Sequence, residues 1–318
     1  MHPLIASLPT LDWATFVQLC VNSLQLGAVY ALLALGYSMV YGVLKLLNFA
    51  HGDVFMIGAY IGYGVLVAFG GSAKPAIAIW VLILLMVLAG MAGCGVLGVL
   101  IERVAYRPLR AAPRIAPLIS ALGVSFFLQN SAQLMFGAAY KPYNTLAFIP
   151  VDSGIHWRNL NVWTMQIVVV GAAFLLMLLL TYLVQRTKVG KAMRAVSFDR
   201  EAAAMMGIDP DRVIVFTFFV GSALAGAAGV LIGLVLFQAF PTMGFSYGLA
   251  AFTAAVVGGI GYIPGAMFGG MLLGLIEAYV AGSFIGSTFV NFVTLSILIV
   301  VMIIRPTGIF GKATIEKV

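Results

Sequence analysis

Long apolar runs dominate the chain and restrict its fold more than any other feature. A helix needs about 20 apolar residues to cross a bilayer, and the sequence contains eight such blocks. They are Ala14–Met39, Ala50–Phe69, Ala76–Leu100, Ala116–Phe136, Val162–Val184, Val213–Phe237, Tyr247–Ala281 and Phe289–Ile304. Only 8% of the 318 residues are charged, whereas an average soluble domain has about 25%. The sequence therefore predicts an all-α, polytopic membrane protein in which residues 1–318 form one transmembrane domain, and it excludes soluble and disordered proteins.

The seventh block is too long for one crossing. As a continuous helix, Tyr247–Ala281 would extend about 52 Å, well beyond a hydrocarbon core of about 30 Å. It contains Gly258-Gly259-Ile260-Gly261 and then Pro264-Gly265. We expect two short helices around this Gly/Pro break, which gives eight to nine crossings. The alternative is a single tilted helix that continues into a surface loop.

Basic residues indicate the orientation of the chain. The loops Glu102–Arg114 and Arg186–Arg212 contain ten of the 17 Lys and Arg residues. Short cytoplasmic loops are enriched in these residues, so we expect both loops in the cytoplasm, the N-terminus outside, and the C-terminal tail with Arg305, Lys312 and Lys317 inside. The net charge of +7 is thus a property of membrane topology and does not indicate nucleic-acid binding.

Motifs for catalysis or nucleotide binding are absent from the sequence. It has no HExxH, GxSxG or GxxxxGK[ST] pattern, and Cys20 and Cys94 lie singly within apolar blocks. We therefore predict a protein that is not an enzyme and that holds no metal and no cofactor of its own. If its activity uses ATP, a partner subunit must bind that ATP.

Uncharged polar residues recur at helical spacing on three of the blocks. They are Gln18, Asn22 and Gln25; Ser125, Gln129 and Gln133; and Asn291 and Thr294. They are candidates for lining a path for a polar solute. Hydrogen bonds between helices are an equally good interpretation.

Few ionisable residues lie in or near the apolar blocks. The run Asn48–Asp53 falls between the first two blocks, on the expected cytoplasmic side, and helix caps with solvated ends are the favoured interpretation. A carrier driven by an ion gradient would need acids within its spans. Glu277 is the one candidate, and it lies near an expected helix end, so the sequence argues against ion coupling.

Small residues form rows on two of the blocks. Gly221, Ala225, Gly229 and Gly233 recur every four residues, and glycines also crowd positions 90–98. Such rows allow helix backbones to approach closely. We expect tight packing within the subunit, with a flexing hinge as the alternative.

Capping residues in the second basic loop predict a short helix there. Ser197 or Asp199 can begin it, and Gly207 can end it. Asp209 can then cap the next span, with Pro210 at its first position. About seven residues cannot hold a helix alone in water, so this helix must pack on its own domain or on a partner. Met205 and Met206 offer apolar contacts for that purpose.

Three segments resemble a known family. Glu201-Ala202-Ala203 followed by Gly207 is similar to the EAA loop of ABC importer permeases. The segments Gly36–Val43 and Leu46–Asp53 resemble the LivH-type permease of branched-chain amino-acid importers, and Val257–Ala266 resembles its Gly-rich late segment. The signature residues are Asn48, His51, Gly52, Asp53, Gly258, Gly259, Gly261, Pro264 and Gly265.

The resemblance implies a permease subunit in a bacterial inner membrane. Its implied partners are a LivM-like permease, two ABC ATPases and a periplasmic binding protein that delivers leucine, isoleucine or valine. It also implies a coupling helix that contacts the ATPase. The expected contact residues are Asp199, Arg200, Glu201, Ala202, Ala203, Met205, Met206 and Gly207. Relatives of this kind carry urea or short amides, so these substrates are an alternative, as is an ATP-independent secondary carrier.

Overall fold

A computed structural model describes the chain at residues 13–70, 78–110, 112–113, 115–143, 154–157, 160–282 and 286–311. Helices make up most of it. They are α1 (Trp13–Leu44), α2 (His51–Gly70), α3 (Ile79–Ile101), α4 (Ile115–Phe136), α5 (Thr164–Arg186), α6 (Lys188–Phe198), α7 (Arg200–Met205), α8 (Pro210–Leu236), α9 (Met243–Gly258), α10 (Ile263–Gly282) and α11 (Val290–Ile304). Short helical turns follow α3, as η2 (Glu102–Tyr106) and η3 (Arg107–Leu109), and precede α11, as η5 (Ser287–Phe289).

Eight of the described helices are long and apolar enough to cross a membrane, which confirms the all-α polytopic fold. They correspond to the eight predicted blocks, because the seventh contributes α10. Large apolar side chains such as Leu84, Leu88, Leu178 and Ile303 are exposed on α3, α5 and α11. A soluble protein rarely exposes so much contiguous apolar surface, whereas lipid can cover it.

The Gly/Pro break in the seventh block is confirmed. The residues between α9 and α10 include Gly259 and Gly261, both with positive φ, a conformation that glycine adopts at little cost. With 16 residues, α9 is only about 24 Å long. The single tilted helix is therefore excluded.

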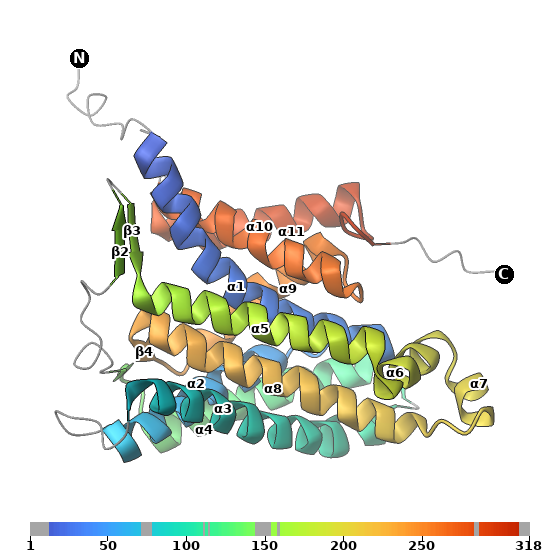
Figure 1. The fold of residues 1–318 in the computed structure, drawn as a ribbon. Coiled ribbons are helices and arrows are strands. Elements are labelled where there is room, and N and C mark those ends of the chain that lie inside the picture. The colour runs from blue at the N-terminus through green and yellow to red at the C-terminus, as the bar shows by residue number, and fades with distance from the viewer. Residues whose placement is uncertain are drawn as a thin grey trace.

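The two ends of the helical bundle differ (Figure 1). One end holds the start of α1 and four short strands: β1 (Lys141–Pro142) pairs with β4 (Gln238–Ala239), and β2 (Gly154–Trp157) pairs with β3 (Leu160–Trp163), both antiparallel. The opposite end holds α6 and α7. Residues after α11 lie at this second end, where the Ile309 amide donates to the Val257 carbonyl at 2.8 Å.

Both basic loops lie at the end that holds α7. Arg107 in η3 contacts Asp211 at the start of α8, with Nη2 and Oδ2 3.0 Å apart. This arrangement agrees with two loops on one side of a membrane, and the first and last described residues lie at opposite ends of the bundle. The sidedness itself stays a prediction, and Arg114, Lys312 and Lys317 lie outside the described residues.

Helix α8 forms the centre of the bundle and contacts α1, α3 and α2 through glycines. A Cβ at Gly221 would lie 3.4 Å from the Gly36 carbonyl oxygen of α1. One at Gly226 would overlap the Gly90 carbonyl of α3, and one at Gly229 would overlap the Phe55 carbonyl of α2. The predicted small-residue row therefore packs within the subunit, and side chains larger than hydrogen do not fit at Gly226 and Gly229.

We expect Gly229→Ala to destabilise the protein because the added methyl overlaps a backbone carbonyl that cannot rotate away. Overpacking of this kind costs roughly 1–3 kcal/mol. Gly171→Ala is the matched control, since a Cβ at Gly171 in α5 meets no atom within 4 Å. Thermal unfolding of the detergent-solubilised protein should give a lower Tm for the first variant and an equal or higher Tm for the control. Equal melting temperatures in all three proteins would contradict the packing argument.

Candidate functional site

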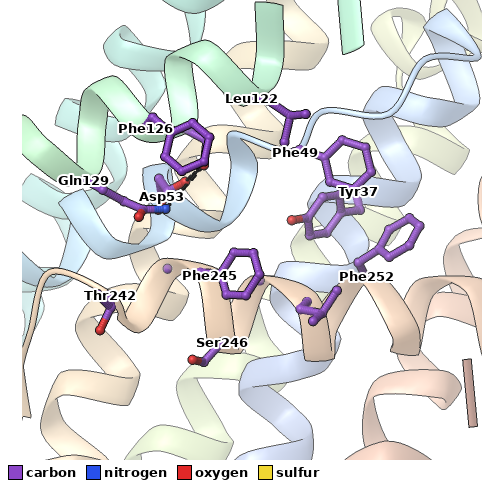
Figure 2. A pocket seen from close by; sticks show the side chains of 14 residues that line it. Tyr37, Phe49, Asp53, Leu122, Phe126, Gln129, Thr242, Phe245, Ser246 and Phe252 are labelled. Atoms are coloured by element: carbon purple, nitrogen blue, oxygen red, sulfur yellow. Dashed lines mark hydrogen bonds between the residues drawn. The ribbon is translucent and has the colours of Figure 1, made fainter. Parts of the chain in front are cut away.

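A cavity of about 410 Å³ lies between α1, α2, α4 and α9. Five aromatic rings and two leucines give it a largely apolar wall, and five polar residues complete it (Figure 2). The lining residues are Tyr37, Phe49, Asp53, Leu122, Ser125, Phe126, Gln129, Thr242, Gly244, Phe245, Ser246, Gly248, Leu249 and Phe252. Pockets of about 300–1,000 Å³ with an apolar wall and few polar groups are typical small-molecule sites.

Asp53 lies deep in the helical layer although it is in the first turn of α2. Its carboxylate accepts a hydrogen bond from Ser125, which is halfway along the 22-residue helix α4. The neighbouring His51 packs against Gly36 of α1, eight residues and so about 12 Å before that helix ends. The segment 45–50 therefore enters the bundle before α2 begins.

This depth corrects the interpretation of Asn48–Asp53 as helix caps with solvated ends. Asn48, His51 and Asp53 are each at most 3% exposed. The Asn48 side-chain oxygen accepts a bond from the Tyr106 hydroxyl at 3.0 Å, and the His51 ring contacts the Tyr37 ring at 4.7 Å between centroids. The segment is thus a packed part of the interior next to the cavity.

Glycines allow α9 to lie directly against the start of α2. A Cβ at Gly248 would lie 2.8 Å from Gly52 Cα, and one at Gly244 would lie 2.5 Å from Asp53 Oδ1. The signature residue Gly52 therefore allows the close contact between α2 and α9 that forms one wall of the cavity. Phe245 and Ser246, which follow Gly244, are exposed and leave the cavity open between α9 and α4.

Of the eight polar residues predicted to line a path, Ser125 and Gln129 are the two that line this cavity in the described part of the chain. Gln129 Nε2 lies 3.4 Å from Ser125 Oγ. Gln133 and Asn291 are exposed on α4 and α11, and Gln25 is buried in α1. We keep Ser125 and Gln129 as the candidates.

The amides at the start of α1 form hydrogen bonds to neighbouring elements. Gln18 exchanges two bonds with the Asn161 backbone in β3, at 3.0 and 2.9 Å. Asn22 accepts from Gln18 and from Gln166 of α5, both at 3.1 Å. These contacts fasten α1 to β3 and α5, which matches the interpretation of the stripe as interhelical bonds.

Glu277 and Thr294 also belong to a structural contact. Glu277 of α10 accepts from the Tyr30 hydroxyl of α1 at 2.6 Å and from the Thr294 hydroxyl of α11 at 2.7 Å. Both carboxylate oxygens therefore have a partner. A buried carboxylate with two donors joins three helices at this position and lies away from the cavity.

The late glycine-rich signature builds the break between α9 and α10. A Cβ at Gly258 would overlap the Gly265 carbonyl, so the two helices touch at the break. Gly259 and Gly261 make the turn, and Pro264 occupies the second position of α10, where the helix needs no amide donor. The segment after α11 closes over the break through the amides of Ile309 and Phe310.

Helices α6 and α7 form an exposed surface at one end of the bundle. The Asp199 side chain caps α7 by accepting from the amides of Glu201 and Ala202 at 2.9 and 3.0 Å, and Gly207 follows the helix with φ +80°. Asp209 and Pro210 begin α8 as predicted. Helix α6 was not expected from the sequence. It buries Gly190, Met193 and Val196 on one face.

Three large apolar side chains of this surface are almost fully exposed. Phe198, Met205 and Met206 are 96%, 85% and 82% exposed. We call them the α7 patch. Ala203 is the buried residue of α7 and fastens it to the domain. Arg200 donates to the Leu44 carbonyl at 3.4 Å. Burial lowers the pKa of Arg200 most, the positive charge of Arg110 lowers it further, and the negative charge of Asp211 acts in the opposite direction.

A cluster of ion pairs lies beside α7. Arg110 contacts both Glu102, which is fully buried, and Asp211 in the first turn of α8. The exposed Arg107 contacts the same Asp211. The cluster therefore connects the end of α3 to the start of α8, and Arg110 is the cation that neutralises Glu102.

The aromatic residues of the cavity wall were not predicted from the sequence. Tyr37, Phe126, Phe245 and Phe252 come from three helices, and in an apolar sequence nothing separates them from lipid-facing aromatics. Thr242 and Ser246 were also missed because they flank the start of α9, which lies outside the predicted block. Asp53 was named as a signature residue at a solvated helix end, although its place inside the apolar block Ala50–Phe69 could have indicated a buried acid.

Comparison with known proteins gives a consistent result over nearly the whole chain. Residues 19–304 match the family model described as the permease component of branched-chain amino acid transport systems. The chain is similar to the high-affinity branched-chain amino acid transport permease BraD of Pseudomonas aeruginosa, with 42% identity over 95% of this chain and 98% of that protein. Similarity to LivH of Escherichia coli K12 has the same extent and identity, and a LivH of Methanocaldococcus jannaschii is 29% identical over 88% of each chain.

The ion-pair cluster gives a test with a matched control. Arg110→Ala leaves Glu102 buried without a cation, and breaking a buried pair in this way costs roughly 3–5 kcal/mol. Arg107→Ala also removes a contact to Asp211, but at an exposed position where a pair contributes about 0–1 kcal/mol. We expect a much lower Tm in detergent for the first variant and a Tm near wild type for the second. Similar melting temperatures for the two variants would contradict this account of Glu102.

Proposed function

The chain belongs to the family of permease components of branched-chain amino acid transport systems, and from that premise we propose that it is the membrane-spanning subunit of an ABC importer for leucine, isoleucine and valine. One observation carries the proposal. Similarity at 42% identity extends over 95% of the chain to permeases described for this transport. The proposed location is the bacterial inner membrane.

The cavity supports transport of a small molecule with an apolar part. Its wall is mostly apolar and includes five aromatic rings, with Ser125, Gln129, Thr242 and Ser246 as uncharged polar groups and Asp53 as the charged one. An aliphatic side chain gains free energy by leaving water for such a wall. Urea and short amides have little apolar surface to bury there, which is why we favour branched-chain amino acids over that alternative.

The α7 patch supports energy supply from a separate ATPase. In the proposed complex, an ATPase subunit covers Phe198, Met205 and Met206, which are otherwise exposed. Binding of ATP changes the inward–outward equilibrium of the permease only if the contacts with α7 differ between the two states. A shift from 1:99 to 99:1 requires a difference of about 5.5 kcal/mol.

The other two proposed partners bind at the opening of the cavity and at the end of the bundle opposite α7. A second permease of the same kind covers the opening of the cavity between α4 and α9, where Phe126 and Phe245 are exposed. A periplasmic binding protein delivers the substrate at the end that holds β2 and β3. In this assembly ATP is held by the two ATPase subunits.

Transport by the intact complex tests the proposal. An affinity tag on this chain should recover a second permease and an ATPase from native membranes. After reconstitution in proteoliposomes, labelled leucine should accumulate only with ATP on the ATPase side and binding protein on the other side. Uptake by this chain alone, driven by an ion gradient, would support a secondary carrier and contradict the proposal.

The α7 patch gives a more specific prediction. We expect the double variant Met205→Gln, Met206→Gln to reduce ATPase recovery with the tagged permease at least tenfold. The reason is that two apolar side chains of the interface are replaced by polar ones of similar length. Met135→Gln is the control, since Met135 is 77% exposed on α4 at the opposite end of the bundle. Pull-down with quantitative immunoblotting provides the measurement. Wild-type recovery in the double variant would contradict docking at α7.

A further inference from the structure

The two carboxylate oxygens of Asp53 differ in their hydrogen bonding to the described residues. Oδ2 accepts from the Ser125 hydroxyl. Oδ1 is buried, and no hydrogen-bond donor reaches it from the described residues. The residue is 1% exposed and lines the cavity. Buried polar atoms are almost always hydrogen-bonded, so an exception in a cavity wall requires an explanation.

We infer that Asp53 recognises the α-ammonium group of the transported amino acid through Oδ1, an inference that rests on the proposed function. An ammonium group provides three donors and no acceptor. A hydrogen bond between it and a carboxylate is charge-assisted and is stronger than a neutral one. The structure thus supplies an acceptor, and the substrate supplies the missing donor.

The surroundings hold this carboxylate in place before substrate binds. Ser125 bonds Oδ2 and is itself within 3.4 Å of Gln129 Nε2. The first turn of α9 lies directly against Oδ1, since a Cβ at Gly244 would be 2.5 Å away. The positive end of a helix dipole is at its N-terminus, so α9 stabilises negative charge on Asp53. Ser125 and Gln129 are positioning residues in this arrangement.

The rest of the cavity fits the side chain of an aliphatic amino acid. Figure 2 shows the rings of Phe126 and Phe245 on opposite sides of the space beside Asp53, with Tyr37 facing Asp53 across it. Aromatic faces attract cations as well as apolar groups. Asp53 is the one charged residue among the described residues of the wall. A charged side chain on the substrate would therefore find no counter-charge there, whereas an aliphatic one would pack on the rings.

Neutralising Asp53 in the intact importer tests the inference. Asp53→Asn keeps the shape and the acceptor for Ser125 but loses the charge. We expect leucine uptake into proteoliposomes to fall at least tenfold, while ATPase stimulation by leucine-loaded binding protein stays within twofold of wild type. Asp53→Glu should recover part of the uptake. A purely structural role would reduce both activities together.

Glu277→Gln is the matched control because Glu277 is a second buried carboxylate in the same domain, with both oxygens bonded. Its uptake should stay within about twofold of wild type. Wild-type uptake by Asp53→Asn, or an equal loss in both variants, would overturn the inference and leave the proposed function standing. A wild-type complex that does not transport leucine would instead refute the proposed function.

Chemical labelling tests the same point without a variant. A hydrophobic carbodiimide modifies carboxyl groups, and peptide mass spectrometry locates the adducts in the wild-type complex. We expect leucine to lower labelling of Asp53 at least threefold, and 4-methylpentanoate, which is leucine without its ammonium group, to have no such effect. Labelling of Glu277 should not respond to either compound. Equal protection by both compounds, or no adduct on Asp53, would overturn the inference.

Discussion

Close backbone contact along α8 is the constraint on which the rest of the structure depends. Within lipid, helices gain little from the hydrophobic effect against one another and associate by tight packing. Gly221, Gly226 and Gly229 bring α8 against α1, α3 and α2, so three spans take their position from one helix. The place of Asp53 follows, because α2 is fixed on α8 through Phe55, two residues further along.

The sequence predicts well those parts of the fold that are set by the lipid environment or by local capping chemistry. Block length and hydropathy located the eight spans, because a helix in lipid must be apolar and about 20 residues long. The α9–α10 break was equally predictable, since a continuous helix would be too long and the run Gly258–Gly261 followed by Pro264 marks where it stops. Asp199 and Gly207 marked the ends of α7 by capping chemistry, which is local and does not depend on the tertiary structure.

Parts of the site that depend on tertiary packing were not predictable. Hydropathy placed Asp53 at a membrane surface because it follows a loop, and nothing local to 45–50 shows that this loop enters the bundle. The depth results from contacts with Gly36 of α1 and Gly244 of α9, which are distant in sequence. Periodicity was similarly ambiguous for the uncharged polar residues. Ser125 faces the cavity whereas Asn22 bonds another helix, although both have polar neighbours at helical spacing.

The proposed ATPase surface and the proposed substrate carboxylate are connected through continuous packing. Asp209 caps α8 directly after α7, and Asp211 joins that end of α8 to Arg110 and the end of α3. Further along, the same helix touches α2 two residues from Asp53. Close-packed interiors deform little and transmit displacements between neighbours. Continuous packing of this kind allows the two sites to influence each other. Whether they are coupled is measured as the change in binding free energy at one site when the other is occupied. The turn 206–209 joins α7 to α8, and α8 contacts α2 where Gly229 meets Phe55, so α7 and the helix that holds Asp53 are both connected to α8.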